Sequence, residues 1–264
     1  MTGFPESFAA PGAVLHVRRI PGPETAPRLV LVNSLGCDLR IWTDVAARLV
    51  GTARVTLYDL RGHGLSEAGA PPYDLADHAA DLVALLEAEG PAHLCGLSIG
   101  GLIAMRVALD RPDRVAGLIL ADTAARIGTA ARYAEREVAI RAGGLAAFAD
   151  AQMERWFSPD FRAARPDAVR IMRAMLVRQP TEGYLGSVAA LRDADLTDEA
   201  GGIGVPTLCL AGSEDASTPP EAVRALAAAI PGARYAEVAG AGHLPCIEAP
   251  QAMADLIAAH LRGG

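Results

Sequence analysis

The sequence lacks the features that mark several classes of protein. It contains no lysine, so its 24 basic groups are all arginines, and 31 acidic groups leave a net charge of −7. An acidic chain is a poor partner for nucleic acid. No apolar run approaches the roughly 18 residues of a membrane span, and the first residues lack the basic and apolar regions of a secretory signal. We therefore expect a soluble, cytoplasmic protein with neither a nucleic-acid nor a membrane partner.

Cysteine is scarce and scattered. The four cysteines, Cys37, Cys95, Cys209 and Cys246, show neither a Cys-x-x-Cys pair nor the Cys/His spacing of a metal site. This pattern indicates neither a disulfide framework nor a zinc site, and it favours buried, reduced thiols. We expect no metal.

Most of the chain alternates between strand-like and helix-like runs. The first strands are rich in β-branched residues and leucine, as is typical of strands buried on both faces of a parallel sheet. Strands are expected at residues 13–20, 28–33, 54–58, 92–95, 115–121, 205–210 and 234–238, and helices at 41–49, 75–89, 101–110, 220–230 and 248–261. This rhythm predicts an α/β fold with helices on both faces of the sheet.

One segment interrupts the rhythm. Residues 126–191 contain several helical runs and no convincing strand, so we expect an all-helical cap inserted in a single domain of residues 1–264, whose core is 1–125 and 192–264. Residues 126–190 hold 10 arginines and 7 acidic residues, a charge of about +3, on an otherwise acidic chain. This basic cap could attract a small anion, or its arginines could simply cover a solvated helix surface.

A candidate nucleophile lies between a strand and a helix. Gly96-x-Ser98-x-Gly100 follows the run 92–95 and opens the helix 101–110, which is the setting of a nucleophile elbow. A serine on such a sharp turn has a strained backbone, and side chains two residues away would collide with neighbouring strand and helix. We expect Ser98 to present its hydroxyl to a substrate.

An acid and a base follow in the order that such a nucleophile requires. His243 lies in a glycine-rich loop after the last strand, where its imidazole could take the proton of Ser98. Two aspartates compete as the acid, since Asp215 and Asp122 each follow a strand. We favour Asp215, which follows the strand nearest His243, and expect the neighbouring Glu214 to point away.

Negative charge that develops on a substrate carbonyl oxygen needs donors fixed in advance. The backbone N–H groups of Ile99, next to the nucleophile, and of Leu35, in the loop after residues 28–33, are the candidates for this oxyanion hole. His63 lies in the loop Arg61-Gly-His-Gly64 and could be mistaken for a second base. We interpret it as structural.

Together these motifs resemble the α/β-hydrolases, over nearly the whole chain. More specifically, the chain resembles the 3-oxoadipate enol-lactonases of the protocatechuate branch of the β-ketoadipate pathway. The elbow and the loop at His63 identify only the superfamily, whereas the segments at the cap are more restrictive. The segments that carry the resemblance are 33–36, 58–64, 95–102, 122–128, 155–157, 183–184 and 218–220.

The resemblance implies a mostly parallel eight-stranded sheet with the helical cap after strand 6. It implies an enzyme in which Ser98, His243 and Asp215 open a small anionic enol-lactone through an acyl-enzyme to give 3-oxoadipate, with no metal or organic cofactor. Arg126 or Arg132 would meet the substrate carboxylate, and Tyr133 and Trp156 would help to form its pocket. The quaternary state is expected to be a monomer or a small homo-oligomer.

Two residues depart from the family pattern, and the changed aromatic residue of the cap could alter the pocket. Asp122 stands where the family has Asn, and Tyr133 where it often has Trp. A carboxylesterase, a carbon–carbon bond hydrolase or a perhydrolase could use the same triad, and a non-catalytic binding protein is a further alternative. Dehalogenases and epoxide hydrolases of this fold are disfavoured, because they need a carboxylate where this chain has Ser98.

Overall fold

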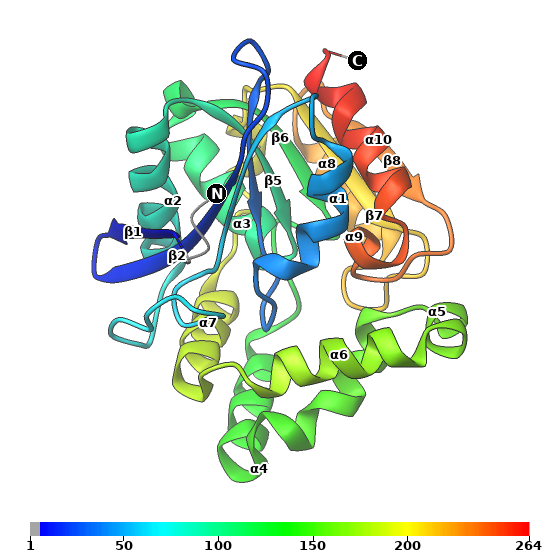
Figure 1. Ribbon diagram of the computed structural model, residues 1–264. Coiled ribbons are helices and arrows are strands. Elements are labelled where there is room, and N and C mark those ends of the chain that lie inside the picture. The colour runs from blue at the N-terminus through cyan, green and yellow to red at the C-terminus, as the bar shows by residue number, and fades with distance from the viewer. Residues whose placement is uncertain (1–5, 264) are drawn as a thin grey trace.

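An eight-stranded sheet forms the centre of the computed structural model, which describes residues 6–263. The strand order is β1-β2-β4-β3-β5-β6-β7-β8 (Figure 1). The hairpin β1–β2 and the pair β2–β4 are antiparallel, and the other neighbouring strands are parallel. The strands are β1 Glu6–Ala10, β2 Ala13–Ile20, β3 Arg28–Val32, β4 Arg54–Tyr58, β5 Ala92–Leu97, β6 Val115–Ala121, β7 Thr207–Gly212 and β8 Arg234–Val238.

The predicted α/β architecture, with its mostly parallel eight-stranded sheet, is confirmed. The periodicity of the sequence located every strand except β1. This strand pairs only with β2 at the sheet edge and alternates between exposed and partly buried residues, so it lacks the apolar run that marks the central strands.

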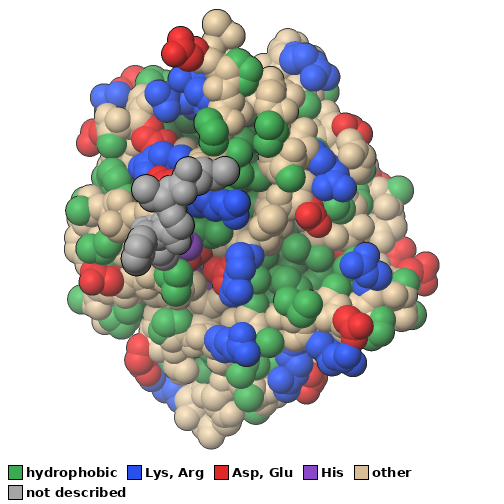
Figure 2. Space-filling view, in the orientation of Figure 1, with side chains coloured by type: hydrophobic (Ala, Val, Ile, Leu, Met, Phe, Trp, Pro, Cys, Tyr) green, Lys and Arg blue, Asp and Glu red, His purple; other side chains and the backbone are tan. Residues whose placement is uncertain are grey.

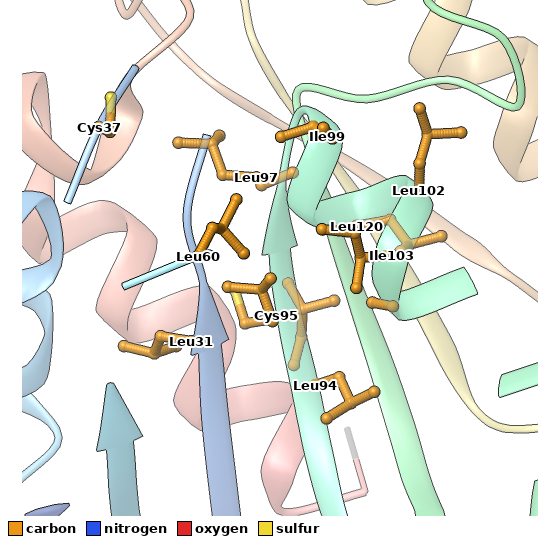
Figure 3. Packing of buried hydrophobic residues seen from close by; sticks show 14 of the residues in the cluster. Leu31, Cys37, Leu60, Leu94, Cys95, Leu97, Ile99, Leu102, Ile103 and Leu120 are labelled. Atoms are coloured by element: carbon orange, nitrogen blue, oxygen red, sulfur yellow. The ribbon is translucent and has the colours of Figure 1, made fainter. Parts of the chain in front are cut away.

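Two layers of helices cover the sheet. α1 (Thr43–Arg48) packs with α10 (Pro250–Leu261) in front of the sheet in Figure 1, and α2 (Leu75–Glu89) packs with α3 (Ile99–Asp110) behind it. α8 (Pro220–Ala229) packs on β7 and β8. The α2 helix begins at the expected cap Asp74, whose side chain accepts from the Asp77 N–H at 2.8 Å. The apolar residues of β3, β5, β6 and α3 meet in the core shown in Figure 3.

The helix expected at residues 248–261 is interrupted. α9 (Pro245–Glu248) ends at Ala249, which has φ −138° and ψ 57°, and α10 begins at Pro250. A residue before proline is disfavoured in the helical region, which accounts for the break. Three short 3-10 helices complete the core: η1 Leu39–Trp42, η2 Pro112–Arg114 and η3 Ala200–Gly202.

Four further helices lie between β6 and β7. They are α4 Ala130–Trp156, α5 Pro159–Ala164, α6 Pro166–Val177 and α7 Thr181–Asp193, and Figure 1 shows them at one end of the sheet. α4 packs against α6 and α7 and changes direction at Gly144, which has φ 69°. No helix within residues 6–263 combines the length and apolarity needed to cross a membrane.

Candidate active site

Ser98 occupies a strained turn between β5 and α3. Its φ is 58° and its ψ −117°, a conformation that costs a non-glycine residue about 1–3 kcal/mol. Contacts with the adjoining strand stabilise it: the Ser98 N–H donates to Ala121 O at 3.0 Å, and Thr123 Oγ1 donates to Ser98 O at 2.7 Å. The strain is therefore held by the surrounding sheet, as the elbow motif requires.

The glycines on either side of Ser98 are sterically required. A Cβ at Gly96 would lie 2.2 Å from Gly100 O, and a Cβ at Gly100 would lie 2.5 Å from Val32 O. Both contacts are with backbone atoms, which cannot rotate away. The close approach of β3, β5 and α3 around Ser98 thus depends on glycine at both positions.

Asp215 and His243 lie in two different loops, 28 residues apart in the sequence, and their side chains meet. Asp215 follows β7 and His243 follows β8, and His243 Nδ1 lies 2.8 Å from Asp215 Oδ2. Thr218 Oγ1 donates to Asp215 Oδ2 at 2.7 Å, and the Ser217 N–H donates to Oδ1 at 2.6 Å. Burial favours a raised pKa for Asp215, but His243 and the two donors outweigh it and lower the pKa below its ordinary value.

An ionised Asp215 determines the tautomer of His243. The carboxylate accepts from Nδ1–H, which leaves Nε2 as the basic nitrogen that could take a proton from a hydroxyl. Glu214, as expected, is exposed. The geometry therefore favours Asp215 over Asp122 as the acid that orients the imidazole.

The loop that carries His243 is tied to the helices above it. The His243 N–H donates to Trp156 O, the last residue of α4, at 2.9 Å. The partly buried Glu248 carboxylate accepts from the Gly242 N–H at 2.8 Å and from Ser158 Oγ at 2.6 Å. No sequence pattern marks Glu248, since a single glutamate near a helix is usually exposed.

A small cavity of about 30 Å³ brings the predicted residues together. Its lining includes Ser98 and His243, and from α4 Arg132, Tyr133 and Trp156. Leu35 also lines the cavity, and Ile99 begins α3, where the first N–H groups have no acceptor within the helix. Both candidate oxyanion donors thus lie beside Ser98.

The described hydrogen bonds of residues 6–263 do not include one between Ser98 Oγ and His243. Catalytic hydrogen bonds are often long in unliganded enzymes and tighten when substrate binds. A rotation of the serine hydroxyl or a small loop movement would have to precede proton transfer.

Arg126 lies outside the cavity. Its exposed guanidinium pairs with Asp195 at 2.9 Å, so the structure does not bring this candidate to Ser98. Two residues that the sequence interpretation missed do line the cavity: Arg136 and Gln152. Arg136 lies one turn after Arg132, and this i, i+4 spacing on α4 would have identified it. Gln152 Oε1 is buried without a hydrogen-bond partner among the described residues.

Positive charge gathers at this cavity. Within residues 6–263, neither Arg132 nor Arg136 is within ion-pair distance of a carboxylate, and the Arg136 guanidinium instead lies over the rings of Tyr133 and Phe148. Burial and then the neighbouring guanidinium of Arg136 lower the pKa of Arg132. Burial, Arg132 and Arg136 likewise lower the pKa of Arg155. Three partly buried cations that repel one another favour an anion between them.

Other arginines of the same helices cover a solvated surface. Arg141 and Arg170 are exposed, Arg173 is partly exposed, and all three pair with nearby acidic side chains. Both interpretations of the basic segment therefore apply, to different faces of its helices.

The loop at His63 does not line the cavity. His63 is buried, its Nδ1 lies 3.2 Å from Arg61 O, and burial lowers its pKa to about 4. Arg61 forms a buried ion pair with Asp81 of α2, with both contacts at 2.7 Å. Since the Gly64 N–H donates to Gln179 Oε1 at 2.8 Å, the loop connects the core to the segment between α6 and α7.

Asp122, Asp215 and His243 are close enough to be considered as metal ligands. One ligand atom from each lies within 4.8 Å of the others. However, the 2.8 Å between His243 Nδ1 and Asp215 Oδ2 is a hydrogen-bond distance, which places a proton between these atoms. We therefore interpret the cluster as a hydrogen-bonded acid–base group.

A larger open groove, of about 820 Å³, lies between α6 and the core. Its lining contains neither Ser98 nor His243. Figure 2 shows hydrophobic side chains bordered by basic ones on this face of the molecule. The groove is thus separate from the predicted site.

Comparison with known proteins agrees with this architecture. A family model described as "Alpha/beta hydrolase family" matches residues 29–256. The chain belongs to the alpha/beta hydrolase family. It is 33% identical to 3-oxoadipate enol-lactonase 2 of Acinetobacter baylyi over 98% of this chain and 97% of that protein.

Solved structures of this hydrolase family superpose closely. The enol-lactonase from Burkholderia xenovorans LB400 has a TM-score of 0.93 and 38% identity, covering 98% of this chain and 100% of that one. A malate-bound thermophilic esterase from Thermogutta terrifontis has a TM-score of 0.90 and 30% identity, covering 98% and 97%. These relatives and the fold support an ester or lactone hydrolase.

Proposed function

We propose that this hydrolase opens the ring of 3-oxoadipate enol-lactone to give 3-oxoadipate, as a step in the catabolism of aromatic compounds through the β-ketoadipate pathway. The observation that carries the proposal is the cavity that combines Ser98 and His243 with arginines that have no carboxylate partner among the described residues. The similarity to enol-lactonases over almost the whole chain supports it.

The first half of the reaction forms an acyl-enzyme. Ser98 Oγ attacks the ring carbonyl carbon while His243 Nε2 takes the hydroxyl proton, and the N–H groups of Leu35 and Ile99 stabilise the negative oxygen. The ring C–O bond then breaks, and the protonated imidazole returns its proton to the leaving enol, which tautomerises to a ketone. Asp215 stabilises the imidazolium throughout.

The second half releases the product. His243 Nε2 takes a proton from a water molecule, the resulting hydroxide attacks the acyl carbon, and Ser98 leaves with the proton returned by the imidazole. Because the enol remains part of the acyl chain, a single product molecule leaves with two carboxylates.

The substrate class follows from charge. The lactone carries one free carboxylate, and a guanidinium binds a planar carboxylate through two parallel hydrogen bonds. Arg132 lies on the cavity wall, with Arg136 one turn along α4. The Thermogutta terrifontis esterase is described as malate-bound, and malate is a dicarboxylate.

We further propose that the helices α4–α7 act as a cap that opens for the substrate. The cavity of about 30 Å³ has roughly the volume of one water molecule, far less than a lactone needs. Tyr133 and Trp156, both buried on α4, would move with the cap and then enclose the ring.

The proposal is tested by following loss of the enol-lactone absorbance with purified protein. The wild-type chain should hydrolyse the lactone, and Ser98→Ala should remove the activity while leaving the circular dichroism spectrum unchanged. A folded wild-type protein that leaves the lactone intact would contradict the proposal.

A carboxylesterase is the second candidate, because the Thermogutta terrifontis esterase superposes with a TM-score of 0.90. The two candidates differ in substrate preference. A value of kcat/KM for p-nitrophenyl acetate well above that for the enol-lactone would favour the esterase. In either case Ser98 should react with a fluorophosphonate probe.

A further inference from the structure

Asp122 is buried beside the acid–base pair but has no role in the reaction described above. It follows β6, is fully buried, and has φ 46°. Its Oδ1 accepts from the Gly212 N–H at 2.7 Å, and its own N–H donates to Leu210 O at 2.8 Å. Backbone hydrogen bonds to the end of β7 thus hold the Asp122 carboxyl group close to the loop that carries Asp215.

The second oxygen of this carboxyl group is unsatisfied. Within residues 6–263, Asp122 Oδ2 has no donor, although it is buried. The polar groups next to it are the Asp215 carboxylate, which is also an acceptor, and His243, and ligand atoms of the three lie within 4.8 Å of one another. Two buried carboxyl groups that face each other can both be satisfied if they share a proton.

The charges around Asp122 decide which acid holds that proton. Asp215 has His243, Thr218 Oγ1 and the Ser217 N–H as partners for a negative charge, whereas Asp122 has only the Gly212 N–H. Burial first, and then the charge of Asp215, raise the pKa of Asp122 well above its ordinary value. The titratable and charged groups around this site are Asp215, His243, Glu248, Cys95, Cys246 and Arg155, whose guanidinium interacts with Asp215 and donates to Ala216 O at 3.1 Å.

We propose that Asp122 and Asp215 form an acid pair that holds one proton, in which neutral Asp122 is a positioning residue that donates to the ionised Asp215. The proton stays on Asp122 throughout the cycle, so that Asp215 keeps both its charge and its orientation toward His243. The inference rests on the proposed function only in requiring that Ser98, His243 and Asp215 act as a hydrolytic triad.

Carbon-13 NMR of protein labelled at the aspartate carboxyl carbon measures the protonation state directly. Asp122→Asn assigns the Asp122 signal by its loss. We expect this signal to report a protonated carboxyl at pH 7, and its pKa to fall in Asp215→Asn, because that substitution removes the neighbouring negative charge. An ionised Asp122 at pH 7, or a pKa unchanged by Asp215→Asn, would overturn the proposal.

Kinetics of two matched variants measure the effect on catalysis. Asp122→Asn keeps a neutral donor and an acceptor for the Gly212 N–H, whereas Asp122→Gly deletes the side chain without strain, since glycine tolerates the positive φ. We expect kcat of the Asn variant to exceed that of the Gly variant roughly 10-fold, with similar KM values, which is the effect of one charge-assisted hydrogen bond. Equal kcat values for the two folded variants would overturn the proposal.

Two controls separate this inference from the proposed function. Ser98→Ala tests the triad itself: if that variant keeps the activity, the proposed function fails, whatever Asp122 does. A chelator tests whether Asp122, Asp215 and His243 bind a metal ion instead of sharing a proton. Activity lost with the chelator and restored by a divalent cation would replace the shared proton with a metal ion and overturn the proposal.

Discussion

Arg132 offers the sharpest test of the anionic substrate. Its half-buried guanidinium lines the cavity and has no carboxylate within ion-pair distance among residues 6–263, whereas Arg126, four residues before α4, is exposed and paired with Asp195. Arg132→Met keeps most of the aliphatic stem and removes the charge. The same change at Arg126 is the matched control.

The expected loss follows from one charge-assisted hydrogen-bonded contact. Such a contact contributes about 1.5–3 kcal/mol when it is sheltered from water, and partial exposure favours the lower end. We therefore expect kcat/KM for the enol-lactone to fall roughly 10- to 30-fold in Arg132→Met, since every 1.4 kcal/mol is a factor of ten. Arg136 remains in place and should limit the loss.

The assay compares a charged with a neutral substrate. Initial rates with the enol-lactone and with p-nitrophenyl acetate are measured for wild type, Arg132→Met and Arg126→Met. Only the lactone rate of Arg132→Met should fall, and mainly through KM. Equal losses on both substrates would mean that Arg132 supports the fold of the cap, and an equal loss in Arg126→Met would refute the assignment of the binding site.

Further predictions concern stability and the elbow. Asp81→Asn should lower the free energy of unfolding by about 3 kcal/mol in chemical denaturation at pH 7, because it leaves the buried Arg61 without its main partner; a loss below about 1 kcal/mol would show that the pair is not sheltered from water. Gly96→Ala should abolish hydrolysis and lower the melting temperature, since its Cβ would lie 2.2 Å from a carbonyl oxygen, whereas Gly204→Ala, with open space around it, should do neither. Asp122→Asn should stabilise the protein relative to wild type increasingly as the pH rises above about 4. Above this pH, Asp122 of the unfolded wild type loses its proton, whereas its raised pKa keeps it protonated in the folded protein. Ionisation therefore stabilises the unfolded state of the wild type and has no such effect on the Asn variant. A difference in the free energy of unfolding between the two proteins that stays constant from pH 4 to 8 would contradict this.

Local sequence patterns were sufficient where one segment determines its own structure. The buried runs of the central strands, the cap at Asp74 and the Gly-x-Ser-x-Gly turn each depend on residues close together in the chain. The chain order of nucleophile, acid and base likewise follows from the parallel sheet, since the carboxyl ends of its strands lie at one edge. The edge strand β1 was missed because three of its five residues are exposed and its stability comes from pairing with β2.

The contents of the cavity depended on how α4 lies over the sheet. The sequence placed Arg126 and Arg132 equally near the cap, but the helix directs only Arg132 and Arg136 to the cavity, while Arg126 precedes it and turns to Asp195. Periodicity indicates which residues share a face of a helix, but it does not say which face meets the site.

What the sequence by itself determined is the class of fold, the strained position of Ser98 and the order of the groups around it, because these depend on local sterics and on the direction of parallel strands. Only the tertiary structure decided that Asp215 pairs with His243, that Glu248 holds the histidine loop to Ser158 at the start of α5, and that among residues 6–263 one oxygen of Asp122 has no donor. Those outcomes depend on distances between side chains far apart in the chain, and burial then makes the energy of each charge depend on its few neighbours.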